Sequence, residues 1–316
     1  MTDHIVSDAD NDIRLDRWFK RHLPHVSHGL LEKLLRKGDV RINGKKAKSA
    51  DHVLVGQTIK VWQAAVSVRE GIDDAKPKRT TSAAVTPEDA ELLQQAVLFK
   101  NKDVIVINKP PGLAVQGGTG IRRSVDSILG ALRFDASERP KLVHRLDKDT
   151  SGVLVLARSA AAAAKLMKAF AGKTAEKTYW ALVKGAPEIQ QGKIDMPLSK
   201  QEEGNVEKVT IDEKDGRKAV TLYTVLERLS SALAWVELLP ITGRTHQLRV
   251  HMASIGHPII GDGKYGGREA FVEGMDFAHK LHLHARRIVI PGMLDVTAPL
   301  PKHMQESWKT LGLEEE

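Results

Sequence analysis

The chain has 316 residues, of which 41% are hydrophobic, and carries 48 Lys and Arg against 40 Asp and Glu, a formal charge of +8. Its length accommodates two domains, its composition excludes wholesale disorder, and its basic excess favours an anionic partner. The absence of cysteine excludes disulfides, thiolate metal sites and thiol catalysis. Because neither a secretory signal nor an apolar run of membrane-spanning length is visible, we expect a cytoplasmic protein with no membrane partner.

Residues 13–62 are predicted to form a small domain of two helices followed by strands. In RLDRWFKRHL, apolar side chains fall on one helical face and basic side chains on the other. A second helix is expected to begin after Ser27, a favourable N-cap, and to end at Gly38. The following VRINGKK predicts a strand and a tight turn at Asn43-Gly44, and GQTIKVW predicts a further strand.

Positive charge is concentrated in this domain, which has 11 Lys or Arg and 3 Asp or Glu between Arg14 and Lys48, a local net charge of +8. Two ordinary amphipathic helices with solvated basic faces would show the same pattern. We favour phosphate binding, because concentrated positive charge gains affinity by releasing counterions from a nucleic acid. The order of helix, helix, turn and strand resembles the S4 RNA-binding domain. The RNA contacts expected in this domain are Arg17, Arg36, Lys37, Arg41, Lys45 and Lys46.

Residues 63–86 are predicted to be a linker, because GIDDAKPKRTTSAAVT is polar and has no regular period. Thr86 then caps a helix that starts with Pro87. Short apolar strands follow in DVIVINKP, SGVLVLAR, KTYWALVKG, ALAWVELLP and RRIVIPG, and the alanine-rich SAAAAAKLMKAFAG predicts a helix between two of them. Since β and α segments do not alternate regularly, we predict an α+β domain with a mixed, largely antiparallel sheet over residues 87–316.

Common cofactor and metal signatures are absent from the sequence. No GxxxxGK[ST] occurs, and neither GGTG at 117–120 nor GDGKYGG at 261–267 fits the dinucleotide-binding pattern. His246, His251 and His257 share one segment, but HExxH is absent, and GxSxG does not occur either. The sequence therefore predicts neither a nucleotide cofactor nor a catalytic metal.

The stretch HRLDKDTSG offers a carboxylate, Asp147, directly before an apolar strand. Taken alone, it reads as a surface turn whose ion pairs are worth under about 1 kcal/mol each. Further along, HQLRVHM reads as a strand, and burial of its Arg249 would require a carboxylate partner. We therefore predict that Asp147 pairs with Arg249, which would hold the carboxylate ionised and oriented, as a nucleophile requires. Tyr179 could supply a ring to stack on a planar substrate or a hydroxyl for proton transfer.

Four segments resemble, in the same order, motifs of the RluA-type pseudouridine synthases. HRLDKDTSG is similar to the motif of the catalytic aspartate, NKPPGLAV to the Lys-Pro motif, KTYWALVKG to the tyrosine motif and GRTHQLRVHMASIGHPIIGD to the arginine motif. The resemblance implies the pseudouridine synthase fold, with Asp147 as the catalytic aspartate, Tyr179 against the target base and Arg249 as the ion-pair partner of the aspartate. The substrate or RNA contacts expected in this domain are Arg145, Lys109, Pro110 and Arg244.

The reaction implied by this resemblance is isomerisation of uridine to pseudouridine in RNA, with bacterial 23S (large-subunit) rRNA as the expected substrate and a monomer as the expected enzyme. It consumes neither water nor a redox equivalent, so no cofactor is required. The sequence leaves open whether Asp147 attacks C1′ of the ribose or removes its 2′ proton. Two alternatives remain: a non-catalytic RNA-binding or ribosome-assembly factor on a synthase-like scaffold, and a glycosidase, although glycosidases normally use two carboxylates.

Overall fold

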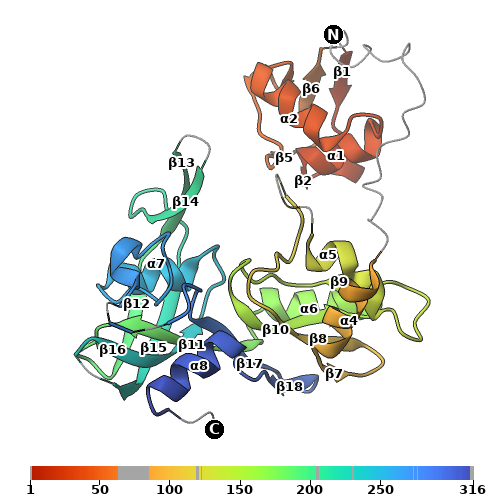
Figure 1. Cartoon of the computed structure of the whole chain (residues 1–316). Helices are drawn as coiled ribbons and strands as arrows, with labels where there is room; N and C mark the ends of the chain where they lie inside the picture. The colour runs from red at the N-terminus through yellow and green to blue at the C-terminus, as the bar shows by residue number, and fades with distance from the viewer. Residues whose placement is uncertain are drawn as a thin grey trace. The chain divides into compact units, whose positions relative to one another are not determined.

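The computed structural model of the chain divides into two compact units, Met1–Arg79 and Thr80–Glu316 (Figure 1). It describes residues 2–62, 85–118, 121, 123–203, 206–229, 231–272, 274–275 and 277–313, with the backbone alone at 202, 203, 206 and 207. Of the linker predicted at residues 63–86, all but Val85 and Thr86 lies outside the described residues. Each unit has a hydrophobic core of its own.

In its described residues, 2–62, the N-terminal unit combines two helices with a small antiparallel sheet. Its helices are α1 (Leu15–His22) and α2 (His28–Lys37), with a short 3-10 turn at Asp8–Asp10, and its strands are β1 (Thr2–Ile5), β2 (Ile13–Arg14), β3 (Val40–Ile42), β4 (Lys45–Lys46), β5 (His52–Val53) and β6 (Thr58–Val61). The sheet order is β1-β6-β3-β4, and β2 pairs separately with β5. β1 lies ahead of residue 13, the predicted start of this domain, and belongs to the same sheet through its pairing with β6.

Local sequence explains where the elements of this unit begin and end. Ser27 Oγ accepts a hydrogen bond from the Leu30 N–H, and Gly38 ends α2 with a left-handed φ of 81°, which confirms both predicted ends of this helix. Asn43 and Gly44 have positive φ angles of 48° and 78°, as a tight two-residue hairpin requires. The core draws on helices and sheet alike and includes Leu15, Trp18, Phe19, Leu31, Val40 and Ile59.

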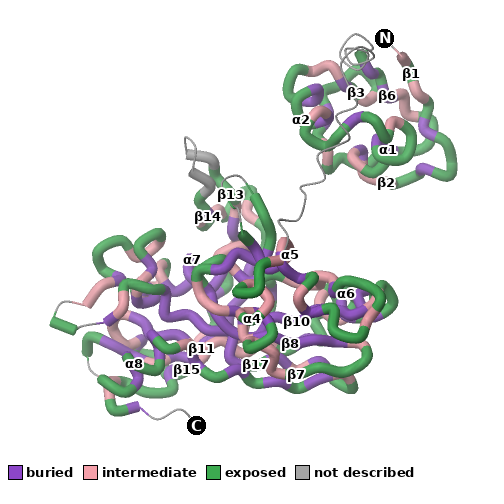
Figure 2. The backbone as a smooth tube through the Cα atoms, turned by 45° about the vertical axis from the view of Figure 1, so that its right-hand side comes forward, coloured by how far each residue is buried: buried purple, intermediate pink, exposed green. Residues whose placement is uncertain are grey.

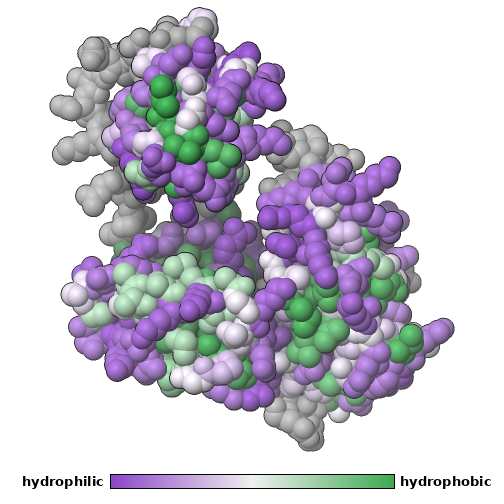
Figure 3. All heavy atoms as spheres, turned by 180° about the vertical axis from the view of Figure 1, so that it is seen from behind, coloured by the Kyte–Doolittle hydropathy of each residue, from purple (hydrophilic) through white to green (hydrophobic). Residues whose placement is uncertain are grey.

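The surface of this unit is mostly hydrophilic. On the face drawn in Figure 3, polar side chains surround a narrow strip of apolar ones. Among residues 2–62, the large apolar side chains that are exposed are Ile5, Leu54, Val55 and Trp62.

The C-terminal unit is built on a ten-stranded sheet. Its strands are β7 (Val97–Lys100), β8 (Val104–Lys109), β9 (Lys141–Leu142), β10 (Ser151–Ala157), β11 (Glu176–Lys184), β12 (Gln191–Asp195), β15 (Val220–Arg228), β16 (Leu233–Pro240), β17 (Leu283–Ile290) and β18 (Leu294–Thr297). The main path runs β12-β15-β16-β11-β17-β10-β8-β7, while β18 pairs with β17 and β9 with β10. β10 and β17 are parallel and the other ladders of this sheet are antiparallel, which confirms the predicted mixed α+β sheet.

Helices cover both faces of this sheet (Figure 1). They are α4 (Pro87–Gln95), α5 (Val125–Ile128), α6 (Ala160–Ala171), α7 (Gln247–Ser254) and α8 (Lys302–Thr310), with 3-10 turns η2 (Leu129–Leu132) and η3 (Gly267–Ala270). Successive residues of β10 face opposite sides, so that Val153 and Val155 pack with α6, and Leu154 and Leu156 pack with α5 and η2. Burial on both faces, visible as continuous purple along the central strands in Figure 2, explains the uninterrupted apolar run VLVLA.

A hairpin stands apart from the main sheet. Its strands, β13 (Leu198–Glu203) and β14 (Val206–Ile211), form a separate two-stranded sheet that projects from the body of the unit (Figures 1 and 2).

Among the helices of the described residues, none is long and apolar enough to cross a membrane.

The segment HQLRVHM is a helix, and the prediction of a strand was wrong. It forms most of α7, in which Leu248 and Met252, four residues apart, both enter the core against β11 and β16. Seven residues are too few to distinguish strand alternation from a helical period. The side chain of Gln247 favours the helix, because its Oε1 accepts hydrogen bonds from the Arg244 N–H (3.0 Å) and the Thr242 hydroxyl (2.7 Å) and so closes the turn before it.

Candidate active site

A cleft of about 740 Å³ opens in the C-terminal unit. It is lined by the loop that precedes β10, by α6 and the residues after it, by β11, and by the turn between β16 and α7. Seven lining residues are Lys or Arg, and Asp147 is the one Asp or Glu among them. The seven cations are Arg145, Lys173, Lys177, Lys200, Lys218, Arg244 and Arg249. The cleft thus combines a surface suited to a polyanion with a single carboxylate.

Asp147 lies in the loop between β9 and β10, and its side chain keeps 24% of its surface exposed. The carbonyl of the next residue, Lys148, accepts hydrogen bonds from the Gly112 N–H (3.0 Å) and from Lys109 Nζ (2.9 Å). The peptide beside the carboxylate is therefore anchored to the segment after β8, although the carboxylate itself remains open to the cleft.

Lys109 has a structural role in place of the predicted substrate contact. It is fully buried, and its Nζ donates to the carbonyls of Pro110 (2.9 Å), Leu113 (2.8 Å) and Lys148 (2.9 Å), so all three ammonium protons are used. Burial lowers its pKa to about 7, against the opposing charges of Asp149 and Asp147. Neither Lys109 nor Pro110 lines the cleft. The Lys-Pro segment acts as a clamp that holds the loop of the aspartate.

The residues after the aspartate secure it to the sheet. Gly152 has a φ of 109°, and a Cβ atom there would lie 2.2 Å from the carbonyl oxygen of Ala285. Only glycine fits this position, because β10 and β17 pair closely in parallel with Gly152 opposite Ala285. Ser151 adds a hydrogen bond of 2.9 Å between its Oγ and His284 Nδ1. Asp149 is exposed, so the contacts of Ser151 and Gly152 anchor this turn.

Tyr179 reaches the same cleft from β11. In the ladder between β11 and β17 its partner is Ala285, the residue that also faces Gly152 of β10, and the register shifts at a β-bulge just before it. Such bulges re-aim side chains next to active sites. Burial raises the pKa of Tyr179, and the charge of Asp147 raises it further, so the hydroxyl keeps its proton and can act as a donor.

Arg249 pairs with Asp262, and the predicted ion pair with Asp147 was wrong. The guanidinium makes a bidentate contact, with Nε 2.8 Å from Oδ2 and Nη2 2.6 Å from Oδ1, between two buried side chains. Asp262 Oδ1 also accepts the backbone N–H groups of Lys264 and Tyr265, both at 3.2 Å. Burial acts to lower the pKa of Arg249, but the bonds and charge of Asp262 outweigh it and raise that pKa.

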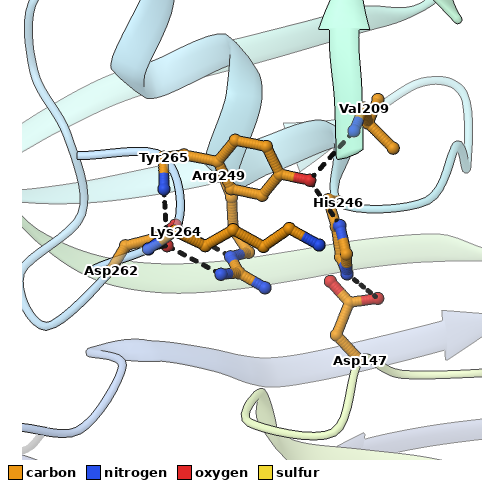
Figure 4. A network of polar contacts seen from close by, with 7 residues as sticks. All are labelled: Asp147, Val209, His246, Arg249, Asp262, Lys264 and Tyr265. Carbon is orange, nitrogen blue, oxygen red and sulfur yellow. Dashed lines mark hydrogen bonds and ion pairs between the residues drawn. The ribbon is translucent and has the colours of Figure 1, made fainter. Parts of the chain in front are cut away.

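The side chain that lies beside Asp147 in place of Arg249 is His246, which the sequence had suggested only as a candidate metal ligand. Its Nε2 lies 3.9 Å from Asp147 Oδ1, and its Nδ1 lies 2.6 Å from the Tyr265 hydroxyl (Figure 4). Burial lowers the pKa of His246, while Asp147 opposes the change. The signal in the sequence was its position three residues before Arg249 in the same motif, but nothing local indicated which acid it faces.

The remaining predicted contacts divide between the two units. Arg145 and Arg244 line the cleft, and Arg244 Nε donates to the Lys218 carbonyl (3.1 Å). All six predicted contacts of the N-terminal unit are exposed: Arg17, Arg36, Lys37, Arg41, Lys45 and Lys46. In the part of the chain that the structure describes, no group of three or more His, Asp or Glu could hold a metal ion.

Comparison with known proteins identifies the class to which this fold and cleft belong. Residues 103–254 match the family model of the RNA pseudouridylate synthases. Ribosomal large subunit pseudouridine synthase C of Rickettsia bellii is 38% identical over 280 residues, covering 88% of this chain and 89% of that protein. The mitochondrial RNA pseudouridine synthase 4 of Arabidopsis thaliana is 34% identical, covering 98% of this chain and 82% of that protein. The solved structure of human RNA pseudouridylate synthase domain containing 4 matches with a TM-score of 0.60 and 30% identity, covering 72% of this chain and 96% of that one.

The chain belongs to the RNA pseudouridine synthase family and is an enzyme that isomerises uridine in RNA. Its four motifs predicted the RluA-type branch of that family, which the relatives confirm. Within the branch, the N-terminal unit and the loop at Gly117 had predicted a closest resemblance to the large-subunit synthase C. That name is carried by relatives from Rickettsia bellii and, at 33% identity over 95% of this chain, Vibrio cholerae.

Proposed function

We propose that this enzyme converts specific uridines of bacterial 23S rRNA to pseudouridine and uses Asp147 as its catalytic carboxylate. The observation that carries the proposal is the composition of the cleft, where Asp147 is the single acid among seven Lys and Arg. Cations bind the phosphates of RNA, and the carboxylate lies among them. Support for large-subunit rRNA comes from the names of the relatives, since the cleft itself carries no mark of a particular RNA.

The target uridine must leave its stack to reach the cleft, as bases do in other base-modifying enzymes. Tyr179 lies where its ring can pack against the uracil, and its protonated hydroxyl can donate to an oxygen of the substrate. Asp147 then either attacks C1′ or removes the 2′ proton, and both routes break the N-glycosidic bond and release a uracil anion. The anion turns within the cleft and C5 bonds to C1′, which breaks the C1′–Asp147 bond on the first route and is accompanied by return of the proton to C2′ on the second. C5 then loses its proton and N1 gains one, so the isomerisation consumes nothing else.

Contacts with RNA outside the reacting nucleotide are assigned to two sets of exposed cations. Arg145 and Arg244 line the cleft beside Asp147. The six predicted contacts of the N-terminal unit are exposed Lys and Arg on its S4-like arrangement of helices and a sheet. Because each phosphate contact releases counterions, RNA affinity should fall steeply as salt is raised.

The decisive experiment replaces Asp147 by Asn in the full chain and measures pseudouridine in transcribed large-subunit rRNA. We expect Asp147→Asn to abolish turnover while RNA binding is retained, because the carboxylate is removed and the lining cations remain. The matched control is Asp149→Asn, an exposed acid two residues away that does not line the cleft, and it should remain active. Turnover by Asp147→Asn would contradict the proposal, and release of free uracil by the unaltered enzyme would identify a glycosidase instead.

The modified sites can be found by mapping pseudouridine in rRNA from cells that lack this protein. Loss of particular sites from 23S rRNA would support the proposed substrate, whereas an unchanged map would contradict it. A cytoplasmic location and a monomeric state remain predictions, which fractionation and light scattering would check.

A further inference from the structure

His246 is built into the turn between β16 and α7 and contacts two other parts of the unit. Its Nε2 lies 3.9 Å from Asp147 Oδ1, and its Nδ1 lies 2.6 Å from the Tyr265 hydroxyl. The tyrosine oxygen also accepts the backbone N–H of Val209 in β14, at 3.3 Å. Two hydrogen bonds and this longer polar contact therefore connect the hairpin β13–β14 to the carboxylate (Figure 4).

The chemistry of these groups determines which one donates a proton in each of the contacts. The Val209 N–H can only donate, so it donates to the tyrosine oxygen. The Tyr265 hydroxyl keeps its proton, since burial raises its pKa, and that proton is left for His246 Nδ1. Nδ1 is then an acceptor, so a neutral imidazole carries its proton on Nε2, the nitrogen that faces Asp147. The opposite tautomer would turn a lone pair toward a carboxylate.

The backbone of His246 is strained in a way that maintains this orientation. Its φ is 53°, in the left-handed region that only a few per cent of residues other than glycine adopt, among which asparagine, aspartate and histidine are the most frequent. The next residue holds the strain in place, because Gln247 Nε2 donates to the Val220 carbonyl (2.9 Å) and to Thr221 Oγ1 (3.0 Å). A costly conformation that its surroundings impose is typical of functional positions.

We propose that His246 is the positioning residue of Asp147. The Tyr265 hydroxyl, which is bonded to the hairpin, selects the Nε2–H tautomer of His246, and this N–H orients the Asp147 carboxylate. The proposal rests on the proposed function, in which Asp147 is the catalytic group. At 3.9 Å the N–H and the carboxylate are slightly too far apart for a hydrogen bond, and such contacts tighten when the substrate is bound. The hairpin, which supplies Lys200 to the cleft lining, is thereby linked to the catalytic group.

The charges around His246 agree with a neutral imidazole at neutral pH. Asp147 and Asp262 favour the protonated ring, whereas Arg249 and Lys264 disfavour it, and burial disfavours it most, so the pKa is lowered. An N–H donor that carries no full charge can orient the carboxylate without forming an ion pair that would quench its reactivity.

The test compares two substitutions at His246 in the full-length enzyme. Asn tolerates the left-handed backbone and places a polar atom near the Nδ1 position, but it cannot reach Asp147. Gln is longer and can present an N–H donor where Nε2 was. We expect His246→Asn to lower kcat by ~10- to 100-fold with little change in KM, as for a catalytic group displaced by about 1 Å, and His246→Gln to recover part of that activity.

Two further variants separate positioning from packing. Tyr265→Phe keeps the ring beside Arg249 but removes the hydroxyl, so kcat should fall less than in His246→Asn. His257→Asn is the matched control, because His257 bonds a backbone carbonyl, that of Lys184, and does not line the cleft, and its kcat should be unchanged. An equal fall of kcat in His246→Asn and His246→Gln, or an unchanged kcat in His246→Asn, would overturn the proposal.

A spectroscopic readout keeps this test independent of activity. In ¹⁵N-histidine-labelled protein, the His246 resonances should show the Nε2–H tautomer, and Tyr265→Phe should populate the other tautomer. Asp147→Asn should lower the pKa of His246 further, since Asp147 opposes its depression. An Nδ1–H tautomer would overturn the proposal even if Asp147 is catalytic. Conversely, the Nε2–H tautomer together with an active Asp147→Asn enzyme would contradict the proposed function of Asp147. It would leave the assignment of the His246 tautomer intact.

Discussion

The two units hold their positive charge in different ways. In the N-terminal unit the predicted RNA contacts are all exposed on the surface of a small helix-and-sheet fold. In the C-terminal unit, cations line a cleft around one carboxylate, and two of the predicted site residues, Lys109 and Arg249, are buried. Exposed charges contribute together to the attraction of an anionic partner, so their effect can be estimated by counting them in the sequence. Buried charges act through particular partners, so their roles depend on which groups the fold brings to them.

The largest expected effect separates a buried pair from an exposed pair of the same kind. Asp262→Asn leaves the buried Arg249 guanidinium without its counter-charge and should lower the free energy of unfolding by about 3–5 kcal/mol. Asp295 makes a similar bidentate contact with Arg287, at 2.7 and 2.5 Å, but both side chains are about half exposed, so Asp295→Asn should cost under about 1 kcal/mol. Urea denaturation measures both, and an equal destabilisation would break the distinction.

The next effect concerns the buried lysine clamp. Lys109→Met leaves three backbone carbonyls without their donor and should destabilise the fold by about 1–3 kcal/mol. Because one of these carbonyls belongs to the loop of Asp147, kcat should also fall, by ~10- to 100-fold. Lys148→Met changes an exposed side chain in the same loop and serves as the control. If both variants behave alike in melting and turnover assays, the clamp is not needed.

A pH titration sharpens the comparison between buried and exposed groups. Burial, with a smaller effect of Lys177, lowers the pKa of His144 to about 3, and its Nε2 accepts the Val155 N–H at 2.8 Å. Between about pH 3 and 6.5 the unfolded chain binds a proton that the fold does not. Stability should therefore fall as the pH drops below about 6.5, by up to about 1.4 kcal/mol per pH unit.

His144→Gln preserves an acceptor for the Val155 N–H but cannot bind the proton, so it should flatten this acid limb of the stability curve. The exposed His28 of the N-terminal unit provides the control, and His28→Gln should leave the limb unchanged. Chemical denaturation at a series of pH values gives the comparison, and a limb that persists in His144→Gln would assign the pH dependence to another group.

The smallest expected effect on stability belongs to the exposed cations. Replacing Lys45 and Lys46 by Gln should change the free energy of unfolding by less than about 0.5 kcal/mol. It should instead reduce the slope of log RNA affinity against log salt by about 0.7–0.9 for each phosphate that is no longer bound. Lys309→Gln, an exposed lysine of α8, should leave the slope unchanged. An unaltered slope in the double variant would remove these residues from the RNA-binding surface.

Several features could be predicted because they depend on neighbours within a few residues. The N-cap at Ser27, the left-handed end of α2 at Gly38 and the hairpin at Asn43-Gly44 follow from backbone chemistry that each residue type carries with it. The doubly buried strand after Asp147 was visible as an unbroken apolar run, since a central strand covered on both faces has no polar side.

The sequence by itself thus determined the mixed sheet, the concentration of charge near the N-terminus and Asp147 as the acid of interest. Only the tertiary structure decided which groups meet around that acid. Arg249 does need a carboxylate, but the fold provides Asp262, 13 residues away, in place of Asp147, and it turns His246 toward Asp147 instead. Burial dictates that a charge must be paired, whereas the choice of partner depends on how α7, the glycine loop after it and β10 pack in space.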